Sequence, residues 1–180
     1  MSESRPSERQ SVSGLMGAML ATIAIIAVGW LPSWVSSRGD ESPASTVDYS
    51  SALAQARAEA PYNVLAPSSV PSGWRATSVE WSGDGPEKSW HLGFLTNEGN
   101  SADYVAVEQS NARPDDFIAR FPADTPAPAV SIAGATWTGL TTADGSEHAL
   151  VLTNDDVTTL VTGTAPESDL EDFAVSLSSG

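Results

Sequence analysis

The chain has 180 residues, no cysteine and a formal net charge of −15 at neutral pH. This length suits one domain with an additional terminal segment, and the lack of cysteine excludes disulfides, iron–sulfur clusters, thiol catalysis and cysteine-based zinc sites. Charges balance within residues 1–35, so the excess negative charge belongs to residues 36–180. Such a field repels phosphate backbones, and we expect no nucleic-acid partner.

An uncharged apolar stretch lies near the N-terminus. No charged residue occurs from position 10 to position 37, and the centre of this interval reads LMGAMLATIAIIAVGWL. A helix needs about 20 apolar residues to cross a bilayer, so we expect residues 12–35 to form a transmembrane helix with the lipid bilayer as its partner. A cleaved signal peptide is the alternative, because residues 27–29 (AVG) resemble a cleavage site, although residues 30–32 (WLP) make a poor new N-terminus.

Basic residues beside the span predict its orientation, because Lys and Arg stay on the cytoplasmic side. Arg5 and Arg9 precede the span, whereas Arg38 alone follows it closely. We therefore expect a single-pass protein of the cell membrane, with its N-terminus in the cytoplasm and its C-terminal domain outside. The expected order is a cytoplasmic tail, a transmembrane helix, a linker and an extracytoplasmic domain, over residues 1–11, 12–35, 36–46 and 47–180.

The first part of the expected domain contains a helix and three strands. Thr46 can cap a helix that begins at Val47 and stops at Pro61, and residues 62–71 resemble an extended strap. Alternating apolar residues then indicate strands, separated by turn residues, at positions 74–81, 89–96 and 102–110.

The second part repeats this order of elements. Pro114 opens a short helix. A strand around Trp137 is then expected within residues 130–141, followed by strands at residues 148–153 and 158–165. Pro166 opens a last helix, in which apolar residues recur at helical spacing at Leu170, Phe173, Ala174 and Leu177. The predicted class is α+β: an N-terminal transmembrane helix and one exported domain of antiparallel sheet with helices on one face, in the order α-βββα-βββα.

Several short motifs resemble one protein family. They are RQSV before the apolar span, PSGWR (71–75), WHLGFL (90–95), EQS (108–110), VTGTA (161–165) and LEDFAVSL (170–177). Together they resemble an uncharacterised single-pass membrane protein family of actinobacteria, the domain of unknown function 4245. The resemblance covers nearly the whole chain. It implies a membrane location in a bacterial envelope and no activity, because none of the motifs is catalytic.

His91 and His148 are the only histidines. Each lies at or near the start of the second strand of its half, so the two halves could bring the imidazoles together. A metal site would need further ligands such as Asp144 or Glu147, and the spacing matches no metal-binding signature. Structural or surface histidines are the alternative, and we expect no metal and no cofactor.

Aromatic residues supply the other candidates for a site. Trp90 and Phe94 alternate with His91 along one strand, and Trp137 lies in a strand of the second half. This pattern predicts either core packing or the aromatic wall of a ligand cleft, with Gly93 allowing close approach. The candidate ligand-binding residues are therefore Trp90, His91, Phe94, Trp137 and His148.

No catalytic constellation can be recognised from the sequence alone. No G-x-S-x-G motif marks a serine nucleophile, and the adjacent carboxylates at 115–116 and 155–156 are explained by helix capping and turns. Acidic loops at 97–103 and 142–147 lack the EF-hand pattern, so hairpin turns explain them better than calcium sites.

We therefore expect a membrane-anchored extracytoplasmic binding or scaffolding module for an envelope protein, polymer or small ligand. A cell-envelope hydrolase with an unrecognised site near His91 and His148 is the alternative. A structural role in a membrane complex, through the small-residue face Gly14, Ala18 and Ala21, is a third. A deep pocket that holds both imidazoles would favour the hydrolase, and separated, exposed imidazoles would favour the binding module.

Overall fold

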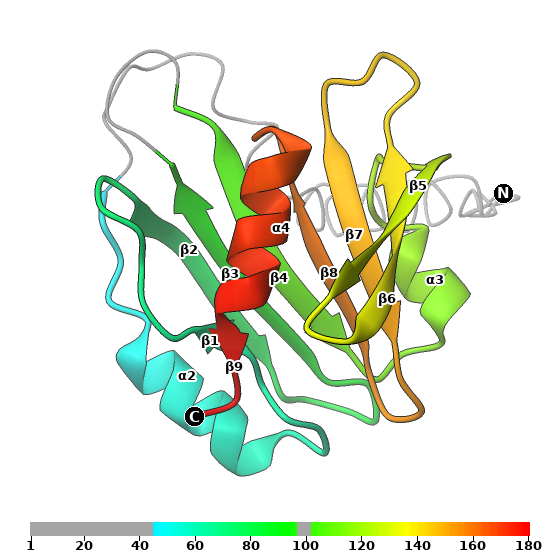
Figure 1. Cartoon of the computed structure of the whole chain (residues 1–180). Coiled ribbons are helices and arrows are strands. Elements are labelled where there is room, and N and C mark those ends of the chain that lie inside the picture. The colour runs from blue at the N-terminus through cyan, green and yellow to red at the C-terminus, as the bar shows by residue number, and fades with distance from the viewer. Residues whose placement is uncertain (1–44, 97–101) are drawn as a thin grey trace, which may run out of the picture. The chain divides into compact units, whose positions relative to one another are not determined.

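Seven antiparallel strands form the central sheet of the fold (Figure 1). The computed structural model describes residues 45–96 and 102–180. The strands are β2 (Arg75–Ser82), β3 (Ser89–Leu95), β4 (Tyr104–Ser110), β5 (Thr125–Ile132), β6 (Ala135–Thr141), β7 (His148–Thr153) and β8 (Thr158–Gly163). Their spatial order is β2-β3-β4-β8-β7-β6-β5, so the last strands of two meanders, β4 and β8, lie side by side.

Helices cover both faces of this sheet. The described helices are α2 (Ser50–Glu59), α3 (Pro114–Ile118) and α4 (Glu167–Ser176), and a short ribbon pairs β1 (Ala66–Pro67) with β9 (Leu177–Ser178). Helices α2 and α4 contribute to one apolar cluster, together with Leu150 of β7, and α3 contributes to another, together with Val151. Consecutive residues of a strand point to opposite faces. Helix α3 therefore lies on the face opposite to α4.

The α+β class and the antiparallel sheet are confirmed, but two details of the prediction are wrong. The expected strand around Trp137 is β6, but β5, which forms a hairpin with β6, is an additional strand that was not predicted. Ala133 and Gly134 both have positive φ, at 50° and 83°, and form a two-residue turn between the paired residues Ile132 and Ala135. The second half thus has four strands in place of three, and the helices do not all lie on one face.

Helix α2 begins at Ser50 rather than at Val47. The Val47 amide donates to the carbonyl oxygen of Ala76 at 2.9 Å, which holds Val47 against β2. Asp48 Oδ1 accepts a hydrogen bond from the Ser50 amide at 2.9 Å. Asp48 therefore satisfies the first amide of the helix, which is the part expected of Thr46.

The expected cytoplasmic tail, transmembrane helix and nearly all of the linker fall in residues 1–44, outside the described residues. Within residues 45–96 and 102–180, no helix is long and apolar enough to cross a membrane. The membrane span and the extracytoplasmic location of residues 47–180 therefore stay predictions.

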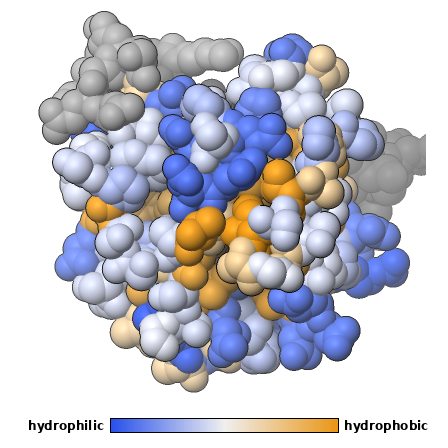
Figure 2. Space-filling view, viewed as in Figure 1, coloured by the Kyte–Doolittle hydropathy of each residue, from blue (hydrophilic) through white to orange (hydrophobic). Residues whose placement is uncertain are grey.

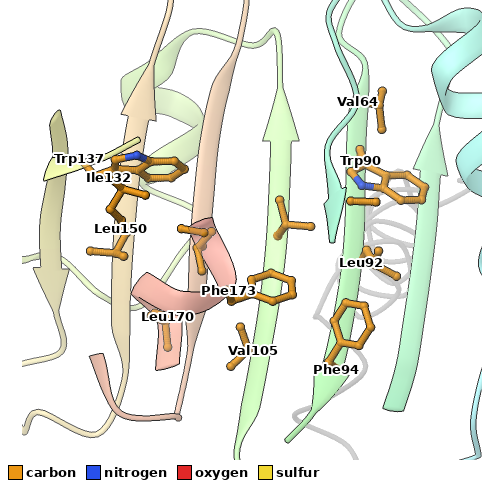
Figure 3. Close-up of a cluster of buried hydrophobic side chains, with 14 of the residues drawn as sticks. Val64, Trp90, Leu92, Phe94, Val105, Ile132, Trp137, Leu150, Leu170 and Phe173 are labelled. Carbon is orange, nitrogen blue, oxygen red and sulfur yellow. The ribbon is translucent and has the colours of Figure 1, made fainter. Parts of the chain in front are cut away.

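The main core lies between the sheet and α4 (Figure 3). Trp90, Leu92 and Phe94 of β3 have 0% exposed surface. Phe173 of α4 contacts Phe94 and Trp74, with ring centroids 5.5 Å and 5.8 Å away. Burial of such large apolar side chains is the dominant stabilising term in folding. Of the two predictions made for Trp90 and Phe94, the structure thus shows core packing.

Figure 2 shows the outer surface on the side of α4, where apolar residues gather near the centre, next to a hydrophilic patch. Val175 of α4 is 63% exposed. Isolated exposed valines are ordinary on protein surfaces, so we assign no function to this residue.

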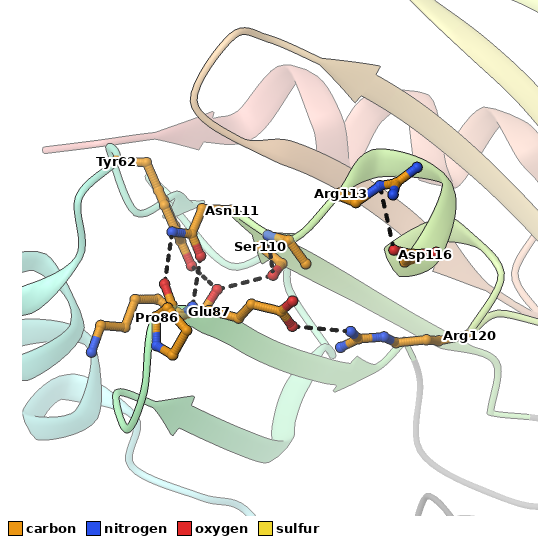
Figure 4. Close-up of polar contacts among 10 residues, drawn as sticks. Tyr62, Pro86, Glu87, Ser110, Asn111, Arg113, Asp116 and Arg120 are labelled. Atoms are coloured by element: carbon orange, nitrogen blue, oxygen red, sulfur yellow. Dashed lines mark hydrogen bonds and ion pairs between the residues drawn. The ribbon is translucent and has the colours of Figure 1, made fainter.

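Polar contacts fix the turn between β2 and β3 (Figure 4). The Asn111 side chain accepts from the Lys88 amide at 2.6 Å and donates to the Pro86 carbonyl at 3.2 Å. The Lys88 carbonyl in turn accepts from Ser110 Oγ at 3.0 Å and from the Tyr62 hydroxyl at 3.3 Å. These bonds tie the turn to the end of β4 and to the strap. They help to hold β2, β3 and β4 in one register.

Candidate functional site

The aromatic residues of the predicted site lie in the core. Trp90 and Phe94 have 0% exposed surface and Trp137 has 4%. The indole Nε1 of Trp90 donates to the carbonyl oxygen of Leu65 at 3.0 Å. All three side chains are therefore engaged in packing rather than presented to solvent.

The two histidines lie on opposite faces of the sheet. His91 directly follows the core residue Trp90 and points away from the core, whereas His148 precedes the core residue Leu150 by two positions and shares its face. Strands β4 and β8 also separate β3 from β7. The structure therefore does not bring the imidazoles together in one pocket, and each ring is half-buried rather than exposed.

His91 belongs to a polar cluster on the face opposite to α4. We define this polar cluster as Ser78 of β2, His91 of β3, and Tyr104 and Glu108 of β4; all four side chains are half-buried. The register places Glu108 directly opposite His91, and Ser78 opposite Gly93. Helix α3, on the same face, packs instead on β7 and β8.

One chain of hydrogen bonds joins the polar cluster. His91 Nδ1 lies 2.5 Å from Glu108 Oε1, and His91 Nε2 lies 2.8 Å from Ser78 Oγ. A carboxylate only accepts, so Glu108 accepts from Nδ1–H, and Nε2 of the neutral ring accepts from the Ser78 hydroxyl. The Tyr104 hydroxyl lies 3.1 Å from Ser78 Oγ and donates to that oxygen.

Gly93 provides the space that the polar cluster occupies. A Cβ atom at this position would clash with the Tyr104 hydroxyl and with Ser78 Oγ. A glycine within a strand often marks such a close approach. The register of β2 against β3 also shifts between Ala76 and Ser78, and a bulge of this kind changes where the next side chain is aimed.

Charges around His91 control its protonation. Burial is the largest single influence and opposes the charged form, but the hydrogen bond and charge of Glu108, with the charge of Glu80, outweigh it. The pKa of His91 therefore lies above its ordinary value of 6.5. Burial raises the pKa of Tyr104 to about 12, so this hydroxyl keeps its proton at neutral pH. Protonation of His91 can thus change the charge of the polar cluster near neutral pH.

Arg75 adds a cation to the same face. It pairs with Leu95, which lies two residues beyond Gly93 on β3. Its Nε atom is buried and has no hydrogen-bond partner among the residues that the structure describes. Leaving a buried donor unpaired costs about 1–3 kcal/mol.

Two surface hollows lie away from the polar cluster. The larger has a volume of about 510 Å³ and includes Gln109, whose Nε2 donates to Asn63 O at 3.2 Å and to Thr159 Oγ1 at 3.1 Å. Gln109 Oε1 accepts from the Leu65 amide at 2.7 Å. These three hydrogen bonds occupy the side-chain amide of Gln109, which therefore holds the strap in place. The smaller hollow, of about 350 Å³, lies beside Ile118 of α3.

The acidic loop at 142–147 is a hydrogen-bonded turn. Asp144 Oδ1 accepts from Thr142 Oγ1 at 2.7 Å, and from Ser146 Oγ at 2.8 Å and Ser146 N at 3.1 Å. These bonds lower the pKa of Asp144 to about 2. In the described ranges, no group of three or more His, Asp or Glu side chains is placed to hold a metal ion. Residues 97–101 of the other acidic loop lie outside those ranges.

Sequence reasoning identified His91 but missed Ser78, Tyr104 and Glu108. Their signal is the polar side of three alternating strands, opposite the side that carries the aromatic residues. The strand alternation could have marked these residues as facing away from the core. Which of them meet depends on the register, and the sequence alone does not supply it.

Comparisons with known proteins place the chain in a family. No curated protein matches it. The crystal structure of MucB in complex with MucA(peri) is similar, with a TM-score of 0.35 and 16% identity, over 63% of this chain and 35% of that one. The structure of the Pseudomonas aeruginosa MucA/MucB complex is similar with a TM-score of 0.35 and 16% identity, over 63% of this chain and 34% of that one. The chain thus spans about a third of the length of these structures. A family described as "Protein of unknown function (DUF4245)" matches residues 8–177, nearly the whole sequence. The chain therefore belongs to the DUF4245 family.

Proposed function

We propose that residues 47–180 form a binding module, that a transmembrane helix over residues 12–35 holds it outside a cell membrane, and that the polar cluster is its recognition site. One observation carries this proposal: Ser78, His91, Tyr104 and Glu108 are fixed in one hydrogen-bonded arrangement, yet each side chain remains partly exposed. The two surface hollows are poorer candidates for a recognition site. In the larger one, the buried side-chain amide of Gln109 already makes hydrogen bonds within the protein.

The polar cluster suits a ligand with acceptor oxygens. Three neighbouring strands hold its side chains, so little conformational entropy is lost when a ligand binds. When His91 is protonated, its Nε2–H donates to Ser78 Oγ, which leaves the Ser78 hydroxyl proton for an acceptor oxygen of a ligand. The net charge of −15 disfavours polyanions. We therefore expect an envelope protein, a polymer or a small ligand that offers one carboxylate or phosphate group and carries little further negative charge.

The membrane anchor rests on the uncharged interval and on Arg5 and Arg9 before it. Washing membranes with carbonate should leave the full chain in the membrane fraction, and protease added to spheroplasts should digest the C-terminal domain. Release of a shortened soluble form would show that the N-terminal segment is a cleaved signal peptide.

Site-specific crosslinking in intact cells tests the recognition site. A photo-reactive amino acid at Glu80, an exposed position opposite His91, should yield a crosslinked adduct. The same group at Asp172, an exposed position on α4, is the control and should yield none. Replacing Ser78 with Ala and Tyr104 with Phe should reduce the adduct at position 80. Equal crosslinking at both positions, unaffected by these replacements, would contradict the proposal.

A further inference from the structure

We infer that Ser78 is a nucleophile that accepts acyl groups from carboxylic esters, with His91 as its general base and Glu108 as the residue that positions His91. The inference rests on the proposed function only in placing the site at the polar cluster. It differs from the hydrolase considered from the sequence, because His148 has no part in it.

The first argument is the order of the groups. A serine hydroxyl is a weak nucleophile until a base within hydrogen-bond reach removes its proton, and a third group must orient that base. Ser78 Oγ, the His91 ring and the Glu108 carboxylate follow in this order, with separations of 2.8 Å and 2.5 Å. Each residue comes from a different strand, and the paired strands β2, β3 and β4 hold them in place.

The second argument is a donor beside the nucleophile. The Tyr104 hydroxyl lies 3.1 Å from Ser78 Oγ and 3.4 Å from His91 Nε2. When Oγ adds to a carbonyl carbon, negative charge develops on the carbonyl oxygen next to Oγ. The protonated Tyr104 hydroxyl can donate to that oxygen. It is the side chain in the polar cluster best placed to do so.

The reaction consists of two balanced steps. Ser78 Oγ forms a bond to the ester carbon while its proton passes to His91 Nε2. The bond from that carbon to the alkoxy oxygen then breaks, and the leaving alcohol takes the proton from His91. In the second step, water adds to the acyl-Ser78 carbon and gives a proton to His91. The acyl–Oγ bond breaks, Ser78 recovers the proton, and a carboxylic acid is released.

Labelling of the full chain with a fluorophosphonate, which forms a stable bond to activated serines, tests the nucleophile. Peptide mapping should place a single adduct on Ser78, and Ser78→Ala should abolish it. Ser82→Ala is the matched control: Ser82 is on the same strand and, four residues on, faces the same side. It should leave labelling unchanged. Peptide mapping of the unaltered chain identifies the labelled serine even if a variant fails to fold. Absence of label on Ser78, or equal label on Ser82, would overturn the inference.

Hydrolysis of p-nitrophenyl acetate by the full chain tests the two assisting residues. His91→Gln should lower the rate about 10²–10⁴-fold, and Tyr104→Phe about 10²-fold. The rate should rise with pH as His91 loses its proton, a loss that Glu108 and Glu80 oppose. Arg75 and Tyr104 are the other titratable groups on this face of β2 and β4. Glu108→Gln should move this rise to lower pH, an effect that a merely structural residue would not produce. A rate that Ser78→Ala leaves unchanged would overturn the inference and leave the crosslinking test of the binding function unaffected.

Discussion

His91 and Glu108 lie directly opposite each other on β3 and β4, with Nδ1 of the imidazole 2.5 Å from Oε1 of the carboxylate. Their side chains are 27% and 15% exposed, so water screens the pair only in part. The contact fixes one orientation of the ring and favours its protonated form. Because Nδ1 of the ring faces Glu108, Nε2 is the nitrogen that faces Ser78 Oγ.

Glu108→Gln should destabilise the protein in a pH-dependent way. The pKa of His91 in the folded chain is raised above its ordinary value of 6.5. Its pairing therefore contributes stability that is fully present below that value and is lost as the pH rises through the folded-state pKa. The difference in Tm between the original chain and Glu108→Gln should be larger at about pH 6 than at about pH 9. Melts that differ by the same amount at both pH values would contradict the pairing.

Gly93→Ala should disrupt the polar cluster, because the new methyl group meets the Tyr104 hydroxyl and Ser78 Oγ. Overpacking of this kind costs about 1–3 kcal/mol. Tyr104→Ala removes both Tyr104 atoms that the new methyl group meets, the hydroxyl and Cζ, so the double variant should lose less stability than the sum of the single variants. Denaturant titrations of the four proteins measure this coupling. Strict additivity would mean that Gly93 and Tyr104 do not meet.

Phe173→Ala should strongly destabilise the fold. Phe173 is 2% exposed and contacts Phe94 and Trp74, and truncating a buried phenylalanine costs about 3–5 kcal/mol. Asp172→Ala is the control, because Asp172 is exposed on the same helix and should change Tm little. If α4 were a detachable partner-binding segment, Phe173→Ala would leave the melt unchanged and weaken only association.

Ala133→Asn should stabilise the hairpin between β5 and β6. Ala133 has φ of 50°, a left-handed conformation that costs an ordinary residue about 1–2 kcal/mol and that asparagine adopts more readily. We expect a gain of up to about 1 kcal/mol in the free energy of unfolding. Ala133→Val is the opposing control, since a β-branched side chain disfavours this conformation further. Thermal melts that rank the valine variant above the asparagine variant would contradict the turn geometry.

Strands and helices with a regular apolar period could be predicted from the sequence. The expected strand over residues 148–153 coincides with β7, and residues 89–96 differ from β3 only at the end. The β5–β6 hairpin could not be found in this way. Its turn uses Ala133 at a position where asparagine or aspartate is the usual signal, so the sequence indicates the strand around Trp137 but not the turn and the strand before it.

The polar cluster depends on information that the sequence does not carry. Alternation places Ser78, His91 and Glu108 away from the core, but only the register determines that they meet. On β2 this register includes an irregularity between Ala76 and Ser78, and moving the pairing by one residue would turn Ser78 to the other face. The sequence predicted a role for His91 without its partners for this reason.

The tautomer of His91 is the property on which the polar cluster most directly depends. Nitrogen NMR of the full chain, labelled with ¹⁵N at histidine and titrated with pH, measures it together with the pKa. We expect the neutral ring of His91 to carry its proton on Nδ1, facing Glu108, and its pKa to lie above 6.5. Glu108→Gln should lower that pKa, and His148 serves as the internal comparison. A neutral ring protonated on Nε2, with a pKa that Glu108→Gln leaves unchanged, would contradict the arrangement of Ser78, His91 and Glu108 on which the account rests.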